Sequence, residues 1–306
     1  MATRTLRAMN CDVELVSSRP DAERRFERAA RWLKGFEARF SRFDPCSELS
    51  RLNAAWGRPV TVSPPMLRLV TAALSFAEAS NGVFDPMVLR ALESLGYGRS
   101  FEQLARGRQA CGEWLGESYS WRDVSVEPAR RTVTLPVGAG IDLGGIGKGW
   151  AVDRLAAILG SPCLVNAGGD IYCAGVPEDC DAWLVGVADP FEPQRDLTVL
   201  RVKDRGVATS SSLRRRWRDG IGWSHHLIDT RTWASSNSDA VQVTAVASNT
   251  LLADYHAKVA LLLGIEAGLG YLNAEADVEG LIVDKAGRMV ASSGLESYVS
   301  AGRIAV

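Results

Sequence analysis

The segment LLADYHAKVALLLG, residues 251–264, is the feature that most limits how this chain can fold. Its apolar residues recur on nearly every side of a helix, and acidic or basic side chains interrupt them only at Asp254, His256 and Lys258. A helix that is apolar all round is buried in the protein. Asp254 and Lys258 stand four residues apart, so the two side chains share one face of this helix.

This acid and base leave two interpretations open. On a surface, an ion pair at this spacing stabilises a helix by only about 0.3–0.5 kcal/mol. In a buried helix each charge is costly unless it is matched. The two side chains therefore form a closely hydrogen-bonded ion pair of the core, or they face a cleft that a ligand fills.

The order of the predicted elements indicates the fold class. Helical periodicity covers about residues 21–42 and 64–82, and residues 43–53 are turn-like and then briefly helical. The second half has short β-branched runs bounded by Gly, Asp and Pro, beginning with IDLGG at 141–145 and interrupted by helices at about 148–160 and 250–263. Ser248 or Asn249 caps the last helix, and Gly264 ends it. This order predicts an α+β fold with mainly antiparallel sheets.

Bulk properties exclude several classes of function. A net charge of −1 gives no general attraction for nucleic acid, and we interpret the basic run LRRRWRDG, 213–220, as a solvated loop or hairpin face. No window has the roughly 18 apolar residues that span a bilayer, and the amino terminus lacks the apolar core of a secretory signal. We therefore expect a cytoplasmic protein with no membrane partner. The six cysteines lack zinc-ribbon spacing and are expected to be reduced.

Two glycine-rich stretches are typical of ligand sites. In DLGGIGKGW, 142–150, glycines precede Lys148 and a helix, so backbone N–H groups and the lysine can hold a phosphate; the alternative is a tight turn with a solvated lysine. In LVNAGGDIY, 164–172, glycines interrupt a strand before Asp170, which can accept hydrogen bonds from a ribose or an adenine amine. The alternative for the second stretch is a β-bulge with an exposed aspartate.

The stretch HHLIDTRT, 225–232, contains two of the three histidines. If it is a continuous strand, His226 and Asp229 point to opposite faces and do not form a same-face pair. An imidazole with a pKa of about 6.5 is suited to act as a base, although a strand histidine is more often a satisfied polar residue.

Taken together, these stretches resemble the ApbE-like FAD:protein FMN transferase family. The resemblance covers nearly the whole chain and is carried by AMNCDVELV, FDPCSELSRLN, NGVFDP, IDLGGIGKGWAVD, LVNAGGDI, VATSS, HHLIDTRT and VTAVASNTLLADYHAK. Each piece alone is a weak signal. Their order, spacing and joint presence are specific.

The resemblance implies an enzyme that uses Mg²⁺ and FAD and transfers FMN to a Thr or Ser hydroxyl of an acceptor flavoprotein, with release of AMP. It also implies a T-fold-like architecture, in which two interlocked halves enclose an FAD cleft. We expect a single domain over residues 1–306, with possible subdomains of about 1–135 and 136–306. The oligomeric state and the acceptor's identity are not predicted.

The resemblance also implies roles for individual residues. Lys148 holds the pyrophosphate, and the Gly147 carbonyl and the Asp254 carboxylate bind the metal ion. His226 deprotonates or orients the incoming hydroxyl. Further positions match residues near the flavin or the adenosine: Met9, Glu48, Asn53, Asp170, Thr209 and Asp229.

The chain departs from the family pattern at the expected catalytic centre. Lys258 stands four residues after the metal-binding acid, where transferases carry threonine and hydrolytic relatives carry aspartate. The family's D-P-x-T-G is DTRTW here, and A-M-G-T is AMNC. Two alternatives therefore stay open: a catalytically silent FAD-binding protein in which Lys258 replaces the cation, and an FAD pyrophosphatase without a protein acceptor.

Overall fold

The computed structural model describes residues 1–104, 119–218 and 222–300 of the chain. The chain forms two compact units from interleaved segments. The first unit contains Met1–Leu33, Lys148–Leu213 and Ser238–Val306, and the second contains Lys34–Gly147 and Arg214–Asn237. A single domain with a division near residue 135 stays a prediction, as does an FAD cleft between two halves.

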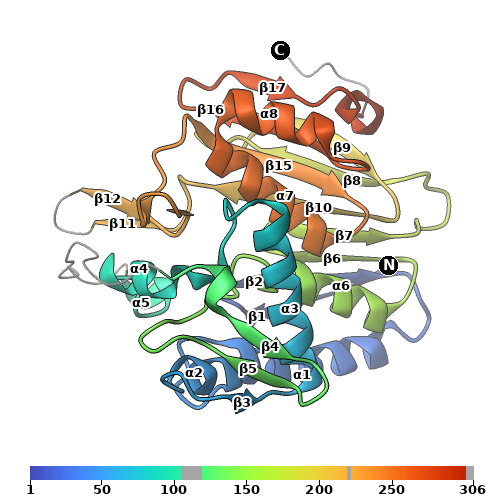
Figure 1. Cartoon of the computed structure of the whole chain (residues 1–306). Coiled ribbons are helices and arrows are strands. Elements are labelled where there is room, and N and C mark those ends of the chain that lie inside the picture. The colour runs from blue at the N-terminus through green and yellow to red at the C-terminus, as the bar shows by residue number, and fades with distance from the viewer. Residues whose placement is uncertain (105–118, 219–221, 301–306) are drawn as a thin grey trace. The chain divides into compact units, whose positions relative to one another are not determined.

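Within the described residues, an eight-stranded sheet is the centre of the first unit (Figure 1). Every pair of neighbouring strands is antiparallel, which confirms the predicted fold class. In spatial order the strands are β1 (Ala2–Ala8), β2 (Cys11–Ser17), β6 (Cys163–Ala167), β7 (Asp170–Ala174), β10 (Arg205–Ser211), β15 (Ala240–Ala247), β16 (Glu279–Asp284) and β17 (Met289–Ala291).

Two hairpins of this sheet turn on residues with positive φ. Met9 and Asn10 connect β1 to β2 with φ of 53° and 56°, and Gly168 and Gly169 connect β6 to β7 with φ of 63° and 100°. Positive φ at both central residues is typical of the type I′ turn, which matches the twist of the flanking strands. The β-bulge alternative for LVNAGGDIY is therefore wrong, and Asp170 is 1% exposed rather than solvated.

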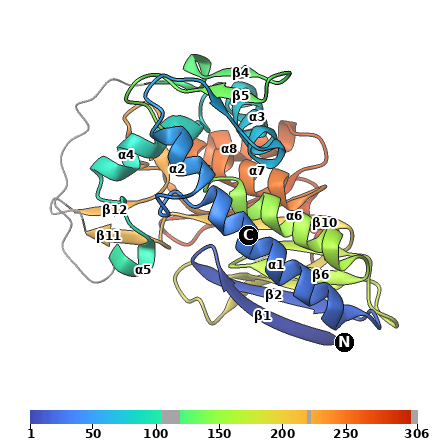
Figure 2. The same cartoon turned by 90° about the horizontal axis from the view of Figure 1, so that it is seen from below.

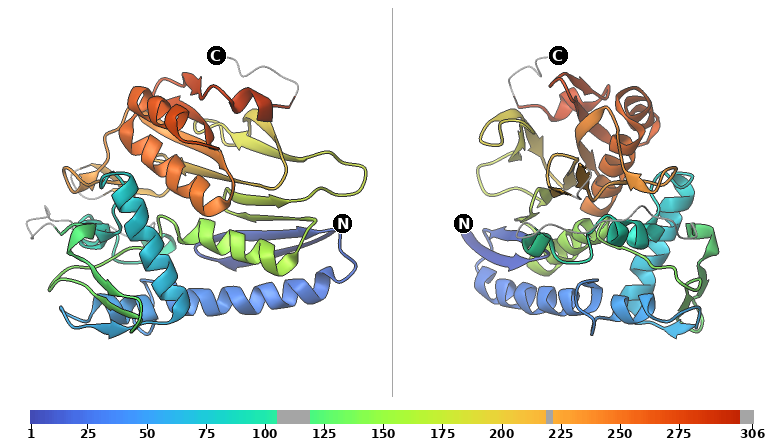
Figure 3. Two further views of the ribbon diagram at one scale, coloured as in Figure 1. Left: turned by 45° about the vertical axis from the view of Figure 1, so that its right-hand side comes forward. Right: turned by 90° about the vertical axis from the view of Figure 1, so that its left-hand side faces the viewer.

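A separate two-stranded hairpin forms a second layer on this sheet. Strands β8 (Trp183–Ala188) and β9 (Asp196–Val202) pair with each other and pack on the sheet face away from the helices α7 and α8 (Figure 3). The buried side chains between them form one apolar cluster: Cys173, Trp183, Val185, Val187, Leu200, Val202, Val207, Val246, Leu281 and Leu295. Burying these side chains is the main stabilising contribution of this layer.

The helix α7 (Thr250–Leu263) lies on the other face, against β10 and β15, and is followed by α8 (Ile265–Ala274) (Figure 1). Asn249 caps α7, because its side chain accepts a hydrogen bond from the N–H of Leu252, and Gly264 ends the helix with φ of 87°. Both boundary predictions are confirmed. Asp254 and His256 are 4% and 6% exposed, so the predicted burial of this helix is also confirmed.

Two glycines allow backbones to meet at the start of α7. A Cβ on Gly149, in α6 (Gly147–Leu159), would lie 2.6 Å from the carbonyl oxygen of Thr250. A Cβ on Gly206, in β10, would overlap the backbone of Asn249 and Thr250. Glycine is required at both places because any side chain would push these elements apart.

The second unit contains short helices, a three-stranded sheet and two hairpins. The sheet has the order β3 (Val60–Thr61), β5 (Thr132–Thr134) and β4 (Ser125–Glu127), and Figure 2 shows β4 and β5 beside α3. Its other elements are α2 (Glu48–Asn53), α3 (Pro64–Ala79), η1 (Pro86–Val88), α4 (Leu89–Ser94), α5 (Phe101–Leu104), η2 (Trp121–Asp123), β11 (Arg216–Arg218), β12 (Trp223–His225), β13 (Ile228–Asp229) and β14 (Ala234–Ser235). Helix α1 (Ala22–Phe40) begins in the first unit and ends in the second, and η3 (Leu295–Tyr298) belongs to the first.

Local signals in this unit agree with the sequence. Ser63 caps α3 by accepting a hydrogen bond from the N–H of Met66, with Pro64 at the first position. The run at 213–220 enters the hairpin β11–β12, where the guanidinium groups of Arg216 and Arg218 lie 4.6 and 5.2 Å from the ring centroid of Trp223. Its interpretation as a solvated hairpin face is confirmed for the described residues.

Two strand predictions are wrong. Residues 141–145 form no strand, because the backbone groups of Ile141 pair with the side chain of Asn53 and the Asp142 N–H pairs with the Pro86 carbonyl. The stretch at 225–232 is not one strand either, since His226 lies between β12 and β13. The expectation that His226 and Asp229 point to opposite faces assumed one continuous strand, so it does not apply here.

Among the residues that the structure describes, no helix has both the length and the apolar character needed to cross a bilayer. The described cysteines are all free thiols, as expected, and Cys111 lies outside the described residues. Burial raises the pKa of the Cys163 thiol to about 12, so this thiol stays protonated at neutral pH.

The packing of α8 on α7 gives a matched test with two glycines of one helix. A Cβ on Gly268 would overlap the Ala260 carbonyl, whereas nothing lies within 4 Å of a Cβ on Gly270. We expect Gly268→Ala to lower the free energy of unfolding by about 1–3 kcal/mol through forced separation of the helices. Gly270→Ala should raise it by up to about 1 kcal/mol through helix propensity. Urea denaturation measures both values, and equal effects would contradict this packing.

Candidate functional site

Lys148 and Asp170 form an ion pair in the first unit. Lys148 is the second residue of α6, and Asp170 is the first residue of β7, directly after the hairpin turn. The Asp170 side chain is 1% exposed, and the Lys148 side chain is 18% exposed. A buried carboxylate without a partner would be strongly destabilising, so Lys148 is fixed by Asp170 and is not the solvated lysine of the alternative interpretation.

Asp254 and Lys258 lie one turn apart on α7. The Lys258 Nζ lies 3.4 Å from Asp254 Oδ1, and the Gly149 N–H donates to Asp254 Oδ2 over 3.4 Å. The two side chains are 5% and 13% exposed. Lys148 contacts Asp170, and the next residue of α6, Gly149, contacts Asp254. The two lysine–carboxylate pairs therefore meet α6 at consecutive residues.

Two further predicted residues belong to the first unit. The Thr209 and Thr244 hydroxyls lie 2.8 Å apart on the paired strands β10 and β15. Met9 is in the β1–β2 turn and has a left-handed backbone conformation. Gly147 opens α6 at the border of the two units, and its role as a metal ligand stays a prediction.

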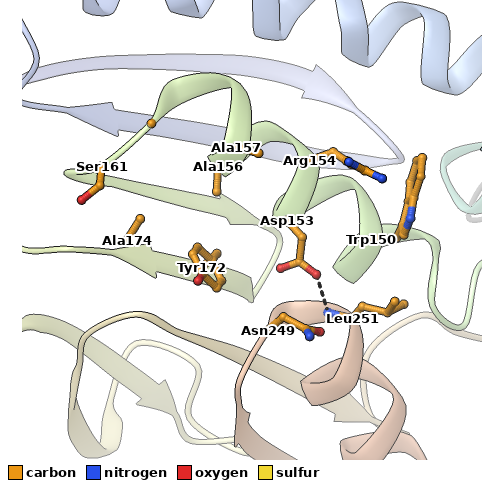
Figure 4. A pocket seen from close by; sticks show the side chains of 11 residues that line it. Trp150, Asp153, Arg154, Ala156, Ala157, Ser161, Tyr172, Ala174, Asn249 and Leu251 are labelled. Atoms are coloured by element: carbon orange, nitrogen blue, oxygen red, sulfur yellow. Dashed lines mark hydrogen bonds between the residues drawn. The ribbon is translucent and has the colours of Figure 1, made fainter.

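Asp153 is a half-buried acid that the sequence interpretation missed. Its two carboxylate oxygens accept hydrogen bonds from the N–H groups of Thr250 and Leu251, over 2.8 and 3.0 Å. Figure 4 shows the bond from Leu251. It thereby caps α7 from another helix, and burial raises its pKa. The sequence did contain one signal: Asp153 stands four residues after Gly149 and therefore lies on the same face of α6.

A pocket of about 500 Å³ lies beside Asp153, between α6, β7 and the start of α7 (Figure 4). The guanidinium group of Arg154 lies 5.4 Å from the ring centroid of Trp150 at this pocket. Its lining is Trp150, Asp153, Arg154, Ala156, Ala157, Gly160, Ser161, Tyr172, Ala174, Asn249 and Leu251. None of the residues predicted from the sequence to bind FAD lines it, so this pocket is not the predicted flavin site.

In the second unit, Glu48 and Asn53 are held by structural hydrogen bonds. Glu48 accepts from the Ser63 hydroxyl at 2.8 Å and from Arg39 Nε at 3.1 Å, which ties α2 to the start of α3 and the end of α1. Asn53 accepts from the Ile141 N–H at 2.8 Å and donates to the Ile141 carbonyl at 2.9 Å. The placement of both near a flavin or adenosine stays a prediction.

The glycine-rich turn before α6 is anchored by an ion pair that the sequence interpretation missed. Arg42 Nε lies 2.7 Å from Asp142 Oδ2, and Asp142 Oδ1 accepts a hydrogen bond from the Gly144 N–H at 2.7 Å. The Arg42 guanidinium lies 4.3 and 4.5 Å from the ring centroids of Phe43 and Tyr97. Two aromatic faces and a carboxylate together fix the planar cation.

The two adjacent histidines of the second unit have different surroundings. His225 Nδ1 accepts from the Leu227 N–H at 3.3 Å and its Nε2 lies 3.0 Å from the Ser236 carbonyl, so the hydrogen bonds assign a neutral ring with the proton on Nε2. His226 is half-buried between β12 and β13. Asp229 is bound by Arg231, whose guanidinium lowers the pKa of the Asp229 carboxyl.

His256, the third histidine, is a core residue. Its Nδ1 lies 2.6 Å from the Tyr271 hydroxyl of α8. Burial lowers the pKa of His256 to about 4, so the ring is neutral at physiological pH.

The predicted residues thus fall in both units. Lys148, Asp170, Asp254 and Lys258 are brought together in the first unit by α6, β7 and α7. Glu48, Asn53, His226 and Asp229 belong to the second unit. One shared site for the two groups stays a prediction.

Comparison with known proteins gives a consistent result. The family model described as "ApbE family" matches residues 8–282. A protein named FAD:protein FMN transferase from Treponema pallidum (strain Nichols) is 29% identical over 94% of this chain and 85% of its own length. Another of that name from Klebsiella pneumoniae (strain 342) is 28% identical over 81% of this chain and 78% of its own length.

Solved structures agree in fold. The crystal structure of the ApbE protein from Thermotoga maritima superposes with a TM-score of 0.84, at 25% identity, over 98% of this chain and 99% of that one. The flavin transferase ApbE from Vibrio cholerae superposes with a TM-score of 0.80, at 23% identity, over 97% and 98%. The second likeness shows the fold alone.

The cap on α7 gives one prediction for this site. Asp153→Ala leaves the N–H groups of Thr250 and Leu251 without their acceptor, so we expect a loss of about 1–2 kcal/mol in the free energy of unfolding. Arg154→Ala, at an exposed position of the same helix, is the control and should change it by less than about 0.5 kcal/mol. Urea denaturation compares the two variants, and similar losses would contradict the capping role.

Asp85 gives a prediction of pH dependence. It accepts hydrogen bonds from the N–H groups of Met87 and Trp121, and burial raises its pKa to about 6, above the ordinary 3.8. The folded state therefore binds the proton more tightly than the unfolded state. The stability linked to this proton is fully present below about pH 4 and is lost as the pH rises through about 6.

Asp85→Asn removes this titration. The free energy of unfolding of the variant, relative to the wild type, should rise by about 2–3 kcal/mol between about pH 4 and pH 7. Urea denaturation across this range measures the difference. A difference that does not change with pH would contradict the raised pKa.

Proposed function

We propose that this chain, which belongs to the ApbE family, is an FAD:protein FMN transferase. The observation that carries the proposal is the family match over residues 8–282, supported by relatives of that name at 27–29% identity over most of the chain. The match includes the paired Lys148 and Asp170 and the buried Asp254.

In the proposed reaction, a Ser or Thr hydroxyl of an acceptor flavoprotein attacks the phosphorus on the FMN side of the FAD pyrophosphate. A bond forms between the hydroxyl oxygen and that phosphorus, and the bond from the phosphorus to the bridging oxygen breaks. AMP leaves with the bridging oxygen, and the hydroxyl proton is released. No oxidant or reductant is needed, because the isoalloxazine ring takes no part.

The start of α6 supports binding of the pyrophosphate. A helix N-terminus presents unpaired N–H groups and a partial positive charge, both of which favour an anion. Lys148 lies in the first turn, and Asp170 holds its side chain in place. We assign Lys148 to neutralising the phosphoryl charge that develops in the transition state.

His226 is the proposed base for the acceptor hydroxyl. It is half-buried in the second unit. His225 is excluded from this role, because hydrogen bonds occupy both of its ring nitrogens. Asp229 is the proposed cofactor-binding acid of this stretch. A cytoplasmic location of the protein stays a prediction.

The magnesium ion implied by the family does not fit the residues around Asp254. Mg²⁺ prefers six oxygen ligands in octahedral geometry, and carboxylates are its usual protein donors. The nearest charged neighbour of Asp254 is the Lys258 ammonium, which donates hydrogen bonds and cannot coordinate. No step of the proposed reaction is therefore assigned to a metal.

The proposal is tested by incubating the purified chain with FAD, with and without a Ser/Thr-bearing acceptor flavoprotein. AMP release and flavin fluorescence that stays on the denatured acceptor are measured in buffers with and without Mg²⁺. AMP release together with covalent flavin is the expected result. AMP without labelled acceptor would indicate an FAD pyrophosphatase. FAD binding without AMP in either buffer would indicate a catalytically silent FAD-binding protein.

His226 gives a prediction for the chemical step. His226→Ala should slow FMN transfer by about 10²–10⁴-fold and leave the FAD dissociation constant nearly unchanged, as is expected for loss of a general base. His226→Gln, which keeps a polar side chain but cannot accept the proton, should be equally slow. Equal losses in transfer and FAD binding would contradict the base role.

A further inference from the structure

We propose that the Lys258 ammonium is the cation of the Asp254 site, so that FMN transfer by this chain runs without a divalent metal ion. The inference rests on the proposed function and concerns which group supplies the positive charge beside Asp254. Its basis is the position of Lys258 on α7, the hydrogen bonds to Asp254 and the charges around them.

The ammonium of Lys258 is adjacent to the carboxylate. Its Nζ lies 3.4 Å from Asp254 Oδ1, and the helical spacing of four residues keeps both side chains on one face of α7. Both are almost completely buried, so solvent screens their attraction little. A cation bound to Oδ1 would have to share this space with the lysine head group.

The second carboxylate oxygen is also in contact with a donor. The Gly149 N–H points to Asp254 Oδ2 over 3.4 Å from the first turn of α6. An N–H group here favours an anion and disfavours a nearby metal ion. Each Asp254 oxygen therefore has a donor of this chain beside it, and a metal ion would have to bind next to both donors.

Charge balance leads to the same conclusion. Lys148 with Asp170 and Lys258 with Asp254 form two pairs whose formal charges sum to zero. A divalent ion at Asp254 would lie within a few ångströms of the Lys258 ammonium, in a buried region where like charges repel strongly. With threonine at position 258, the same region would carry one unpaired negative charge and would attract such an ion.

The lysine also has a chemical reason to be useful. An ammonium is a compact cation with three donors, and a fixed cation stabilises the negative charge that develops on a transferring phosphoryl group. The 13% exposure of its side chain leaves part of it accessible at the surface of the first unit. Lys258 thus supplies from the chain the positive charge that a metal would otherwise bring.

The test compares Lys258→Thr, Lys258→Met and the wild type. Lys203→Thr, at an exposed position of the same unit, is the control for loss of one positive charge. FAD-dependent AMP release with acceptor is measured in EDTA and then with millimolar Mg²⁺. In parallel, Mn²⁺ is titrated into each protein and free Mn²⁺ is followed by electron paramagnetic resonance.

We expect the wild type and Lys203→Thr to release AMP at the same rate in EDTA and in Mg²⁺, and to bind no Mn²⁺. Lys258→Thr should lose at least about tenfold in EDTA, recover with Mg²⁺ and bind Mn²⁺ at one site. Lys258→Met, which removes the charge and adds no oxygen, should lose activity in EDTA as well. Asp254→Asn added to Lys258→Thr should abolish Mn²⁺ binding.

Other outcomes overturn the inference. Wild-type activity that disappears in EDTA and returns with Mg²⁺ would show that a metal binds beside Lys258. Full metal-free activity of Lys258→Met would show that the lysine is only an ion-pair partner of the core. If the Lys258 variants release no AMP in either buffer, their circular dichroism and Mn²⁺ binding decide the matter. A folded Lys258→Thr protein without bound Mn²⁺ overturns the inference.

The failure of the proposed function gives a different result. In that case the wild type releases no AMP with or without Mg²⁺, whether or not it binds FAD. The inference about Lys258 fails only when wild-type turnover exists and depends on the metal, or when the variants behave against the expectation. The Mn²⁺ titration does not depend on turnover.

Discussion

Thr250, the first residue of α7, is the point on which the candidate site of the first unit depends. Its N–H donates to Asp153 of α6, and its hydroxyl donates to the Ile171 carbonyl of β7. Gly149 and Gly206 let the backbones of α6 and β10 touch it from two sides. Because α7 begins at this fixed point, Asp254 lies one turn further on, at the Gly149 N–H. The position of the candidate acid thus follows from backbone packing.

Charges in this region are compensated within the chain. Asp170 and Asp254 are each paired with a lysine, and Asp153 accepts hydrogen bonds from two N–H groups. Burying an ionised group is tolerated only with such partners. For the same reason, replacing Lys258 should affect the site more than replacing a lysine on the surface. Lys258 places a positive charge beside the buried Asp254 carboxylate, which also accepts a hydrogen bond from the Gly149 N–H.

Much of the fold could be predicted from the sequence because its signals are local. The cap at Asn249, the stop at Gly264, the proline-led α3 and the antiparallel class all follow from propensity and periodicity. Two strand predictions failed where side chains replaced the sheet ladder, as Asn53 does for Ile141. Asp153 and Arg42 were missed because capping another helix, or anchoring a distant turn, leaves no periodic pattern in the sequence.

The sequence by itself determined the family, the mainly antiparallel α+β class, the burial of α7 and the spacing that puts Asp254 and Lys258 on one face. Only the tertiary structure decided that Lys148 pairs with Asp170, that Gly149 faces Asp254 and that Asp153 caps α7. These contacts join residues separated by 22 to 105 positions. Such partners are chosen by which surfaces pack together when the chain folds, and helical or strand periodicity within a short window carries no information about that choice.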